Sequence, residues 1–200
     1  MKSSLISLSF FIIGIICGVY SLFSAQIINS NLSEYALYLL MFLVGISVGG
    51  DRKTWKTLKE MNLKIVLVPL TVIAGSLLGA GIMSMILNQL TLKEGLAVGA
   101  GFGYYSLSSI IITKFYSETL GVVALMSNMI REILTLLLAP LIGKYFGKLA
   151  PIASGGATSM DTTLPIITQS SGKDYAIISV FSGVVLTILV PFLVTFIVTR

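Results

Sequence analysis

Residues 154–165 read SGGATSMDTTLP and place one carboxylate, that of Asp161, inside a segment that is otherwise small, hydroxylated or apolar. Gly155 and Gly156 precede Asp161 and Pro165 follows it, and both residue types interrupt α-helices. An ionised side chain at the centre of a bilayer costs from about 3 to more than 10 kcal/mol, so it usually faces a protein interior or a wet cavity. We therefore expect a broken helix whose peptide groups and Asp161 line a cavity. The alternative is a kinked helix in which the glycines serve close packing.

The composition of the 200-residue chain indicates that lipid is its solvent. Hydrophobic residues make up 56% and charged residues 10%, and the mean hydropathy is +0.99, whereas a soluble domain carries about 25% charged residues. A span needs about 20 apolar residues, and suitable segments occupy residues 5–23, 35–49, 65–87, 92–113, 120–142, 149–169 and 175–198. We expect an all-α integral membrane protein with about seven transmembrane segments, some of them broken, in which residues 1–200 form a single transmembrane transporter domain.

Basic residues indicate the orientation. Five of the thirteen lie in one inter-helical segment, namely Arg52, Lys53, Lys56, Lys59 and Lys64. Such clusters stay in the cytoplasm, so counting segments puts the N-terminus inside and the C-terminus outside. The count places Lys114 and Lys173 inside, in agreement with the rule, and Lys144 and Lys148 outside, against it. The net charge of +5 is thus a signal of topology, and no nucleic-acid partner is expected.

The segment 120–142 carries Asn128, Arg131 and Glu132. On a helix Asn128 and Glu132 share a face, as do Arg131 and Thr135, because each pair is four residues apart. The neighbours Arg131 and Glu132 point about 100° apart and are poorly placed to pair with each other. An ion pair between Asp161 and Arg131 would leave Glu132 for a cation. The alternative is a buried network of these charges that only holds helices together.

A second glycine-rich break is expected in the segment 92–113, where residues 99–109 read GAGFGYYSLSS. It lacks the preceding strand and the Gly-Lys-Ser/Thr of a nucleotide-binding loop. Its hydroxyls, including Ser106 and Ser108, suit a second wall of the cavity, with an ordinary packing face as the alternative. Residues 99–113 and 154–168 share a plan of small residues, then hydroxyls, then an aliphatic run that ends in Thr. Transporters are often built from repeats whose interrupted helices meet at mid-membrane.

Other classes of site find little support in the sequence. Histidine is absent, which removes the commonest metal ligand and the Ser–His pair of hydrolases. An intramembrane aspartyl protease needs two facing aspartates, and Asp161 is the only aspartate within an expected span. The lone Cys17 cannot form an internal disulfide. We expect no enzyme, no cofactor and no metal site.

Three blocks carry a resemblance to a known family: GFGYYSLS (101–108), NMIREI (128–133) and GATSMDTTLP (156–165). They resemble the lysine exporter LysO family of prokaryotic inner-membrane proteins, and the similarity extends from the first helix to the C-terminus. The resemblance implies export of L-lysine and of toxic analogues such as thialysine from the cell, across the inner membrane. It also matches the intramembrane acids of the family to Glu132 and Asp161.

The same resemblance implies a bile-acid-symporter-like fold with two inverted five-helix repeats. Full-length members of the family carry about three more helices ahead of the part that this chain resembles. The chain is therefore expected to lack the first three helices of that fold and to be the larger piece of a split exporter. A small three-helix partner subunit, or a homodimer, would complete the unit.

Residues and resemblance together suggest lysine/proton antiport. Glu132 and Asp161 would each take one ammonium group of lysine, and Arg131 or the N-terminus of a broken helix would take the carboxylate. Protons would occupy the acids when lysine leaves. The expected substrate-binding or ion-binding residues are Glu132, Asp161, Arg131, Asn128, Ser106, Ser108, Thr158, Ser159 and Thr162. The alternatives are an inorganic cation/proton antiporter, which would take Na⁺, and a non-transporting membrane subunit whose charges only specify assembly.

Overall fold

The computed structural model describes residues 65–87 and 89–200, together with the isolated positions 13, 16–20, 35, 39 and 42. The basic segment 51–64 and nearly all of the expected spans 5–23 and 35–49 lie outside the described residues. Within 65–87 and 89–200 all regular structure is helical. This part of the chain contains both glycine-rich segments and all of the candidate site residues.

Three helices among the described residues are long and apolar enough to cross a bilayer: α5 (Leu67–Leu87), α8 (Glu118–Phe146) and α11 (Tyr175–Thr199). They correspond to the expected segments 65–87, 120–142 and 175–198. Ser117 begins α8 by accepting a hydrogen bond from the backbone N–H of Leu120 at 3.2 Å, as an N-cap serine does. The long α8 has 29 residues and a length of about 43 Å, so it reaches from one membrane face to the other.

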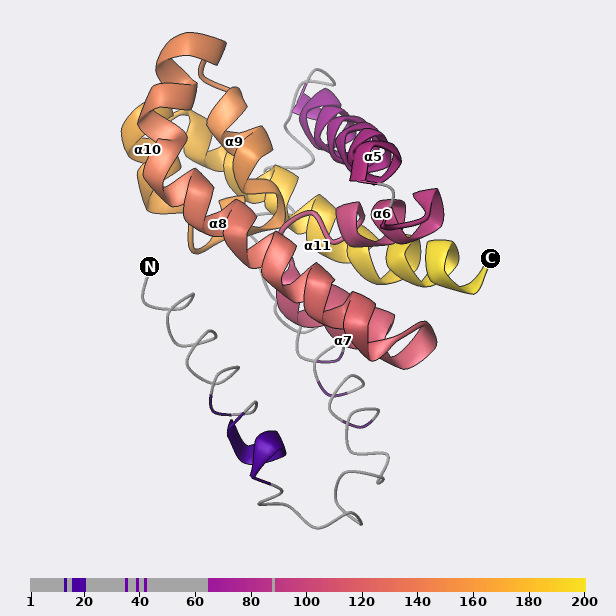
Figure 1. Ribbon diagram of the computed structural model, residues 1–200. Coiled ribbons are helices and arrows are strands. Elements are labelled where there is room, and N and C mark those ends of the chain that lie inside the picture. Colours follow the sequence, from indigo (N-terminus) through magenta and orange to yellow (C-terminus); the bar gives the residue numbers. More distant parts are fainter. Residues whose placement is uncertain are drawn as a thin grey trace.

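The first glycine-rich segment forms a hairpin rather than a span. It consists of α6 (Leu92–Gly99) and α7 (Tyr105–Phe115). The Tyr116 hydroxyl donates to the Glu94 carboxylate at 3.0 Å, although these residues would lie about 33 Å apart in a continuous helix. Both ends of the segment 92–115, hereafter hairpin 1, therefore lie on the same side of the molecule, close to the N-terminal end of α8 (Figure 1).

The second glycine-rich segment behaves in the same way from the opposite side. It consists of α9 (Ala150–Gly155), the 3₁₀ helix η2 (Gly156–Met160) and α10 (Leu164–Ser171). The Lys148 ammonium, just before α9, donates to the backbone carbonyl of Ser170 at the end of α10 at 3.0 Å. The segment 150–171, hereafter hairpin 2, thus enters and leaves beside the C-terminal end of α8, where Figure 1 places α9 and α10.

The expectation that residues 92–113 and 149–169 cross the membrane is therefore wrong, while the expectation that both are broken is confirmed. Each segment is long and apolar enough to span. At its midpoint, however, the backbone adopts positive φ values, 46° at Phe102, 95° at Gly103 and 60° at Gly156, and these turns send the chain back. A count of apolar residues cannot distinguish a span from such a hairpin.

The hairpins also change the distribution of lysines that segment counting gave. Lys114 lies beside the N-terminal end of α8, whereas Lys144, Lys148 and Lys173 lie at or after its C-terminal end. The expectation that Lys114 and Lys173 share a side, opposite Lys144 and Lys148, is wrong. It assumed that each glycine-rich segment moves the chain across the membrane.

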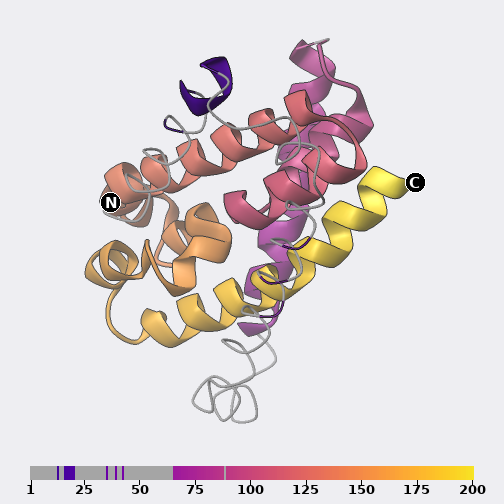
Figure 2. The ribbon, with the colours of Figure 1, turned by 90° about the horizontal axis from the view of Figure 1, so that it is seen from below.

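The core lies where the hairpins pack between the long helices. Figure 2 shows α9 and α10 between α8 and α11. The larger buried cluster joins the tip of hairpin 1, including Phe102 and Leu107, to Leu186 and Val190 of α11. A smaller cluster, Val68, Ile152 and Ile167, with Tyr175 packed against it, joins the start of α5 to hairpin 2 and the start of α11.

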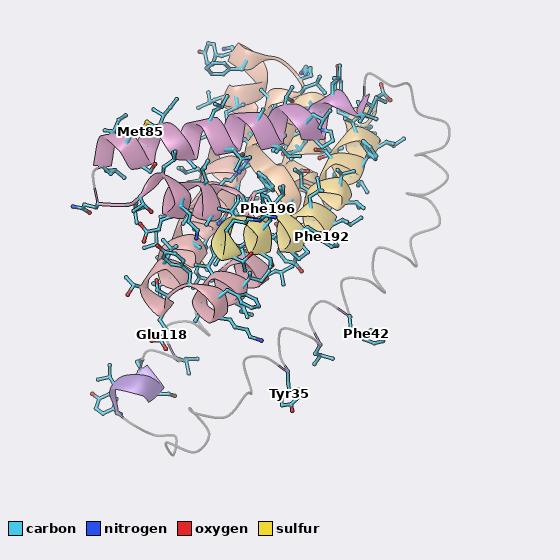
Figure 3. The ribbon with its side chains drawn as sticks, turned by 90° about the vertical axis from the view of Figure 1, so that its right-hand side faces the viewer. Tyr35, Phe42, Met85, Glu118, Phe192 and Phe196 are labelled. Atoms are coloured by element: carbon cyan, nitrogen blue, oxygen red, sulfur yellow. The ribbon has the colours of Figure 1, made fainter. Side chains whose placement is uncertain are left out.

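The outer surface is apolar, as a lipid-facing surface must be. Met85 of α5 and Phe192 and Phe196 of α11, which Figure 3 labels, are all more than half exposed. Phe192 and Phe196 are four residues apart and share one face of α11. Together with the three long apolar helices, this surface identifies the chain as an integral membrane protein.

The close approach of the hairpin tips predicts that Gly156 cannot carry a side chain. A Cβ there would collide with the carbonyl oxygen of Phe102, and the φ of 60° disfavours any L side chain. We expect Gly156→Ala to lower the free energy of unfolding by about 2–4 kcal/mol. The thermal unfolding midpoint of the purified protein in detergent would measure this.

Gly75→Ala is the matched control, because a Cβ at Gly75 on α5 meets nothing within 4 Å. Alanine is the better helix former, so this variant should be neutral or slightly stabilised. Equal unfolding midpoints for the two variants would contradict the close contact of the tips.

Candidate functional site

The tips of the two hairpins touch through their backbones. The amide of Ala157 donates to the carbonyl of Phe102 at 2.8 Å, and a Cβ on Gly103 would lie 3.1 Å from the carbonyl oxygen of Gly155. Phe102 and Ala157 occupy equivalent positions in the two similar stretches 99–113 and 154–168. The two segments enter from opposite sides and meet at equivalent points, which is the geometry of an inverted repeat.

Asn128 of α8 holds the tip of hairpin 1. Its Oδ1 accepts from the backbone N–H of Gly103 at 2.7 Å, and its Nδ2 donates to the carbonyls of Val98 at 3.3 Å and Ala124 at 2.9 Å. The side chain is only 4% exposed. The break leaves Gly103 without an intrahelical partner, and an unpaired peptide group at this depth is costly. Asn128 supplies that partner.

Arg131 of α8 holds hairpin 2. Its Nε and Nη2 donate to the carbonyls of Ser154 at 2.8 Å and Ala153 at 2.9 Å, and Nη1 donates to the hydroxyl of Ser76 on α5 at 3.0 Å. The two carbonyls belong to the last turn of α9, where a helix leaves carbonyls free and favours a cation. Thr135, one turn further along α8, bonds to the Ser154 hydroxyl at 2.8 Å.

The ion pair expected between Asp161 and Arg131 is not formed, and that prediction is wrong. Asp161 instead accepts from the backbone N–H of Thr162 at 2.5 Å and from its hydroxyl at 3.3 Å. The physical reason is that the helix breaks after α9, which leaves the carbonyls of Ala153 and Ser154 free to accept hydrogen bonds from the guanidinium of Arg131. The sequence places two charges in neighbouring segments, but it does not reveal these competing acceptors.

Glu132 and Asp161 lie near the meeting point of the tips. Glu132 is fourteen residues from either end of α8 and 0% exposed, so it lies at the middle of a helix that is long and apolar enough to cross a bilayer. Asp161 follows η2 at the tip of hairpin 2 and is exposed. The charge of Asp161 interacts electrostatically with Glu132 and with the hydroxyl of Tyr104, which precedes α7. Both acids therefore contribute to one negative region.

The predicted hydroxyl residues fall into two groups. Ser108 donates to the carbonyl of Tyr104 at 2.8 Å, and Thr158 donates to the carbonyl of Gly155 at 2.9 Å. Both hydroxyls therefore satisfy backbone groups of the tips. Thr162 faces Asp161, as described above, while Ser106 is half-buried near the start of α7.

Ser159 bonds to α11, in a contact that sequence reasoning missed. Its hydroxyl donates to the carbonyl of Ser179 at 3.0 Å, and the Ser179 hydroxyl donates back to the carbonyl of Ser159 at 2.8 Å. Both side chains are fully buried. Nothing in the apolar sequence around Ser179 distinguishes it from other serines in helices. Ser76, a partner of Arg131 on α5, was missed for the same reason. Ser154, the partner of Thr135, lies in the quoted stretch 154–165 but was not singled out.

A cavity of about 520 Å³ opens between α5, α6 and α8. Its floor includes Ser76, Asn128 and Arg131, and its other end includes Leu87 and Leu90. Among the residues that the structure describes, no group of three or more His, Cys, Asp or Glu side chains is arranged to hold a metal ion.

The role of Asn128 is testable apart from any transport. Asn128→Ala leaves the buried amide of Gly103 without its acceptor and removes a donor from the carbonyls of Val98 and Ala124. We expect the free energy of unfolding to fall by about 2–4 kcal/mol, since each orphaned buried group costs about 1–3 kcal/mol. Thermal unfolding in detergent measures it. The control is Ile130→Ala, at an exposed position of the same helix, which should change the unfolding midpoint far less. A similar loss of stability in both variants would contradict the role of Asn128 in holding hairpin 1.

Two curated proteins are similar to this chain in sequence. The lysine exporter LysO of Escherichia coli K12 is 35% identical over 164 residues, which cover 82% of this chain and 54% of that protein. A Haemophilus influenzae Rd protein, provisionally named a lysine exporter, is 36% identical over 170 residues, which cover 84% of each chain. This chain thus spans about half the length of the E. coli relative. No solved structure matches it.

A family model described as lysine exporter LysO matches residues 8–198. The match includes both hairpins, all of α8 and nearly all of α11. The description is that of a transporter rather than an enzyme. The chain belongs to the lysine exporter LysO family.

Proposed function

We propose that this chain forms the transport core of a membrane exporter of L-lysine and of analogues such as thialysine. One observation carries the proposal: fully buried Glu132, at the centre of α8, shares a negative region with Asp161 at the tip of hairpin 2. Acids at this depth mark an ion or substrate path. The names of the E. coli and H. influenzae relatives supply the substrate.

The charges at mid-membrane favour exchange of one cation for another. Among the described residues, Arg131, Glu132 and Asp161 together leave one unit of negative charge when all are ionised. Lysine carries a net charge of +1, so either one lysine or one proton neutralises the region. Leaving that charge without a counter-cation is costly in a medium of low dielectric constant. The site therefore favours states that hold lysine or a proton, and moving between them is antiport.

The ammonium groups of lysine would bind at the acids. Glu132 and Asp161 come from different elements, α8 and hairpin 2, and each offers carboxylate oxygens for a charge-assisted hydrogen bond. Thr162 and Tyr104 border Asp161 and would complete its surroundings. The tips are held in place by Asn128, Thr158, Ser108 and Ser159. Ser106 lies in the first turn of α7, next to the tip of hairpin 1.

The lysines around α8 favour one orientation. Lys144, Lys148 and Lys173 gather at its C-terminal side, which is also where α5 begins, directly after the basic segment 51–64. By the positive-inside rule this side is cytoplasmic. The C-terminus, at the far end of α11, is then outside, and so are the open ends of hairpin 1. In this orientation the protein is a multi-pass inner-membrane protein with its N-terminus in the cytoplasm, and Lys144 and Lys148 obey the rule.

Further helices would complete the transport unit. The E. coli relative is nearly twice as long as the matched region, and α5 exposes Leu67, Leu70, Leu78 and Ile82 along its length. A small three-helix subunit or a second copy of the chain would cover such a face. Co-purification from the native membrane, followed by intact mass measurement, would identify which one it is.

Neutralising the acids should stop export. We expect Glu132→Gln and Asp161→Asn each to reduce lysine efflux and thialysine resistance by at least about 100-fold, because an amide holds no charge for the ammonium group. Efflux from lysine-loaded cells measures the rate, and membrane immunoblots check the amount of protein. Glu118→Gln and Asp174→Asn are the matched controls, since both acids lie at the ends of helices. Normal efflux from either mid-membrane variant would defeat the proposal.

The driving ion is tested in proteoliposomes that contain the purified protein and labelled lysine. An acidic outer buffer should accelerate lysine efflux at least about fivefold, because each entering proton replaces a departing lysine. An imposed potassium diffusion potential should have little effect, because a one-for-one exchange moves no net charge. If a sodium gradient drives lysine efflux and a proton gradient does not, sodium is the coupling ion and lysine/proton antiport is wrong.

A further inference from the structure

The cavity between α5, α6 and α8 leads from one membrane face to mid-membrane. It begins near Leu87 and Leu90, at the N-terminal side of α8, and ends at Arg131, next in sequence to the buried Glu132. Its volume of about 520 Å³ lies within the range of about 300–1,000 Å³ for small-molecule sites. A molecule the size of an amino acid fits in it.

The floor of this cavity presents an incompletely used guanidinium. Arg131 has five N–H donors, and three of them bond to the carbonyls of Ala153 and Ser154 and to the hydroxyl of Ser76. One N–H remains on each terminal nitrogen. Among the described residues, none of these bonds is to a carboxylate. A guanidinium with two such donors matches the two oxygens of a carboxylate.

No acidic side chain in the described walls of the cavity competes for the two remaining N–H donors of Arg131. Ser127 and Asn128 flank Arg131, Gly75 and Gly79 keep α5 thin, and Val98 and Val123 are apolar. No Asp or Glu stands among the described lining residues. The cavity therefore offers the guanidinium of Arg131 to a carboxylate, whereas it offers an ammonium group only neutral acceptors such as the hydroxyls of Ser84 and Ser127.

We infer that the cavity is the outward vestibule of the exporter and that Arg131 binds the α-carboxylate of the departing amino acid there. The inference rests on the proposed function. The Cα atoms of Arg131 and Glu132 are about 3.8 Å apart, which is less than the length of an extended lysine side chain. Their side chains point about 100° apart around α8, so a lysine that leaves the acids meets Arg131 only after it passes into the cavity. The consequence is selectivity: L-lysine binds in the cavity at least about tenfold more tightly than diamines that lack a carboxylate.

A cysteine at Gly79 tests this directly. Gly79 lines the cavity less than one turn from Ser76, and a Cβ there meets nothing within 4 Å. Cys17 is the only natural cysteine, so Cys17→Ser removes the background. Labelling of Gly79→Cys by a charged maleimide is followed on the purified full chain, with L-lysine, L-lysinamide or cadaverine added. Glu118→Cys, exposed at the start of α8, is the matched control (Figure 3).

We expect Gly79→Cys to react and L-lysine to protect it, with half-protection by L-lysinamide and cadaverine at concentrations at least about tenfold higher, since both lack the group that Arg131 binds. Arg131→Gln in the same background should reduce protection by L-lysine to the level of cadaverine. Glu118→Cys should react equally under all conditions. If Arg131→Gln does not fold, the ligand series on the intact Arg131 still decides.

Equal protection by all three ligands, no protection by L-lysine, or an unreactive Gly79→Cys beside a reactive Glu118→Cys would overturn the inference. Lysine efflux from cells is measured separately for the unmodified chain. Normal efflux with no carboxylate selectivity refutes the vestibule site alone. Absence of lysine efflux refutes the proposed function, whatever the labelling gives.

Discussion

The fold depends on satisfying the peptide groups that two broken helices expose at mid-membrane. Lipid offers them no hydrogen bonds, so every partner must come from the protein. α8 provides most of these partners: Asn128 serves hairpin 1, and Arg131 serves the end of α9. α11 adds the reciprocal bonds between Ser179 and Ser159. The tips complete the arrangement through the bond from Ala157 to Phe102.

This constraint joins structure to chemistry. The residues that hold the hairpins, Asn128 and Arg131, lie four residues and one residue before Glu132 on α8. Asp161 directly follows η2 in hairpin 2. A shift of hairpin 2 against α8 therefore changes the separation of the two acids. Packing at the tips leaves little room for gradual adjustment, since Gly103, Gly155 and Gly156 are in close contact with their neighbours. Such interfaces favour discrete arrangements over continuous deformation.

Much of the site follows from the sequence by simple physical arguments. Glu132 and Asp161 are conspicuous because charges are rare in apolar segments, and Gly156 and Pro165 indicate the break because both residue types disturb helices. Residues 99–113 and 154–168 share a residue pattern, and Phe102 and Ala157, which bond to each other, occupy equivalent positions in it. The expected ion pair between Arg131 and Asp161 was wrong, because the sequence shows the two charges but not the backbone carbonyls of α9 that bind Arg131 instead.

The sequence by itself determined that this chain is a membrane protein, that two of its apolar segments are interrupted, and that each of two apolar segments contains an acidic residue. Only the tertiary structure decided that the interrupted segments turn back, that Arg131 binds backbone carbonyls, and that a cavity ends at its side chain. The physical reason is one of range. Hydropathy and helix propensity act over neighbouring residues, whereas the contact of Tyr116 with Glu94 and that of Lys148 with Ser170 form across more than twenty positions.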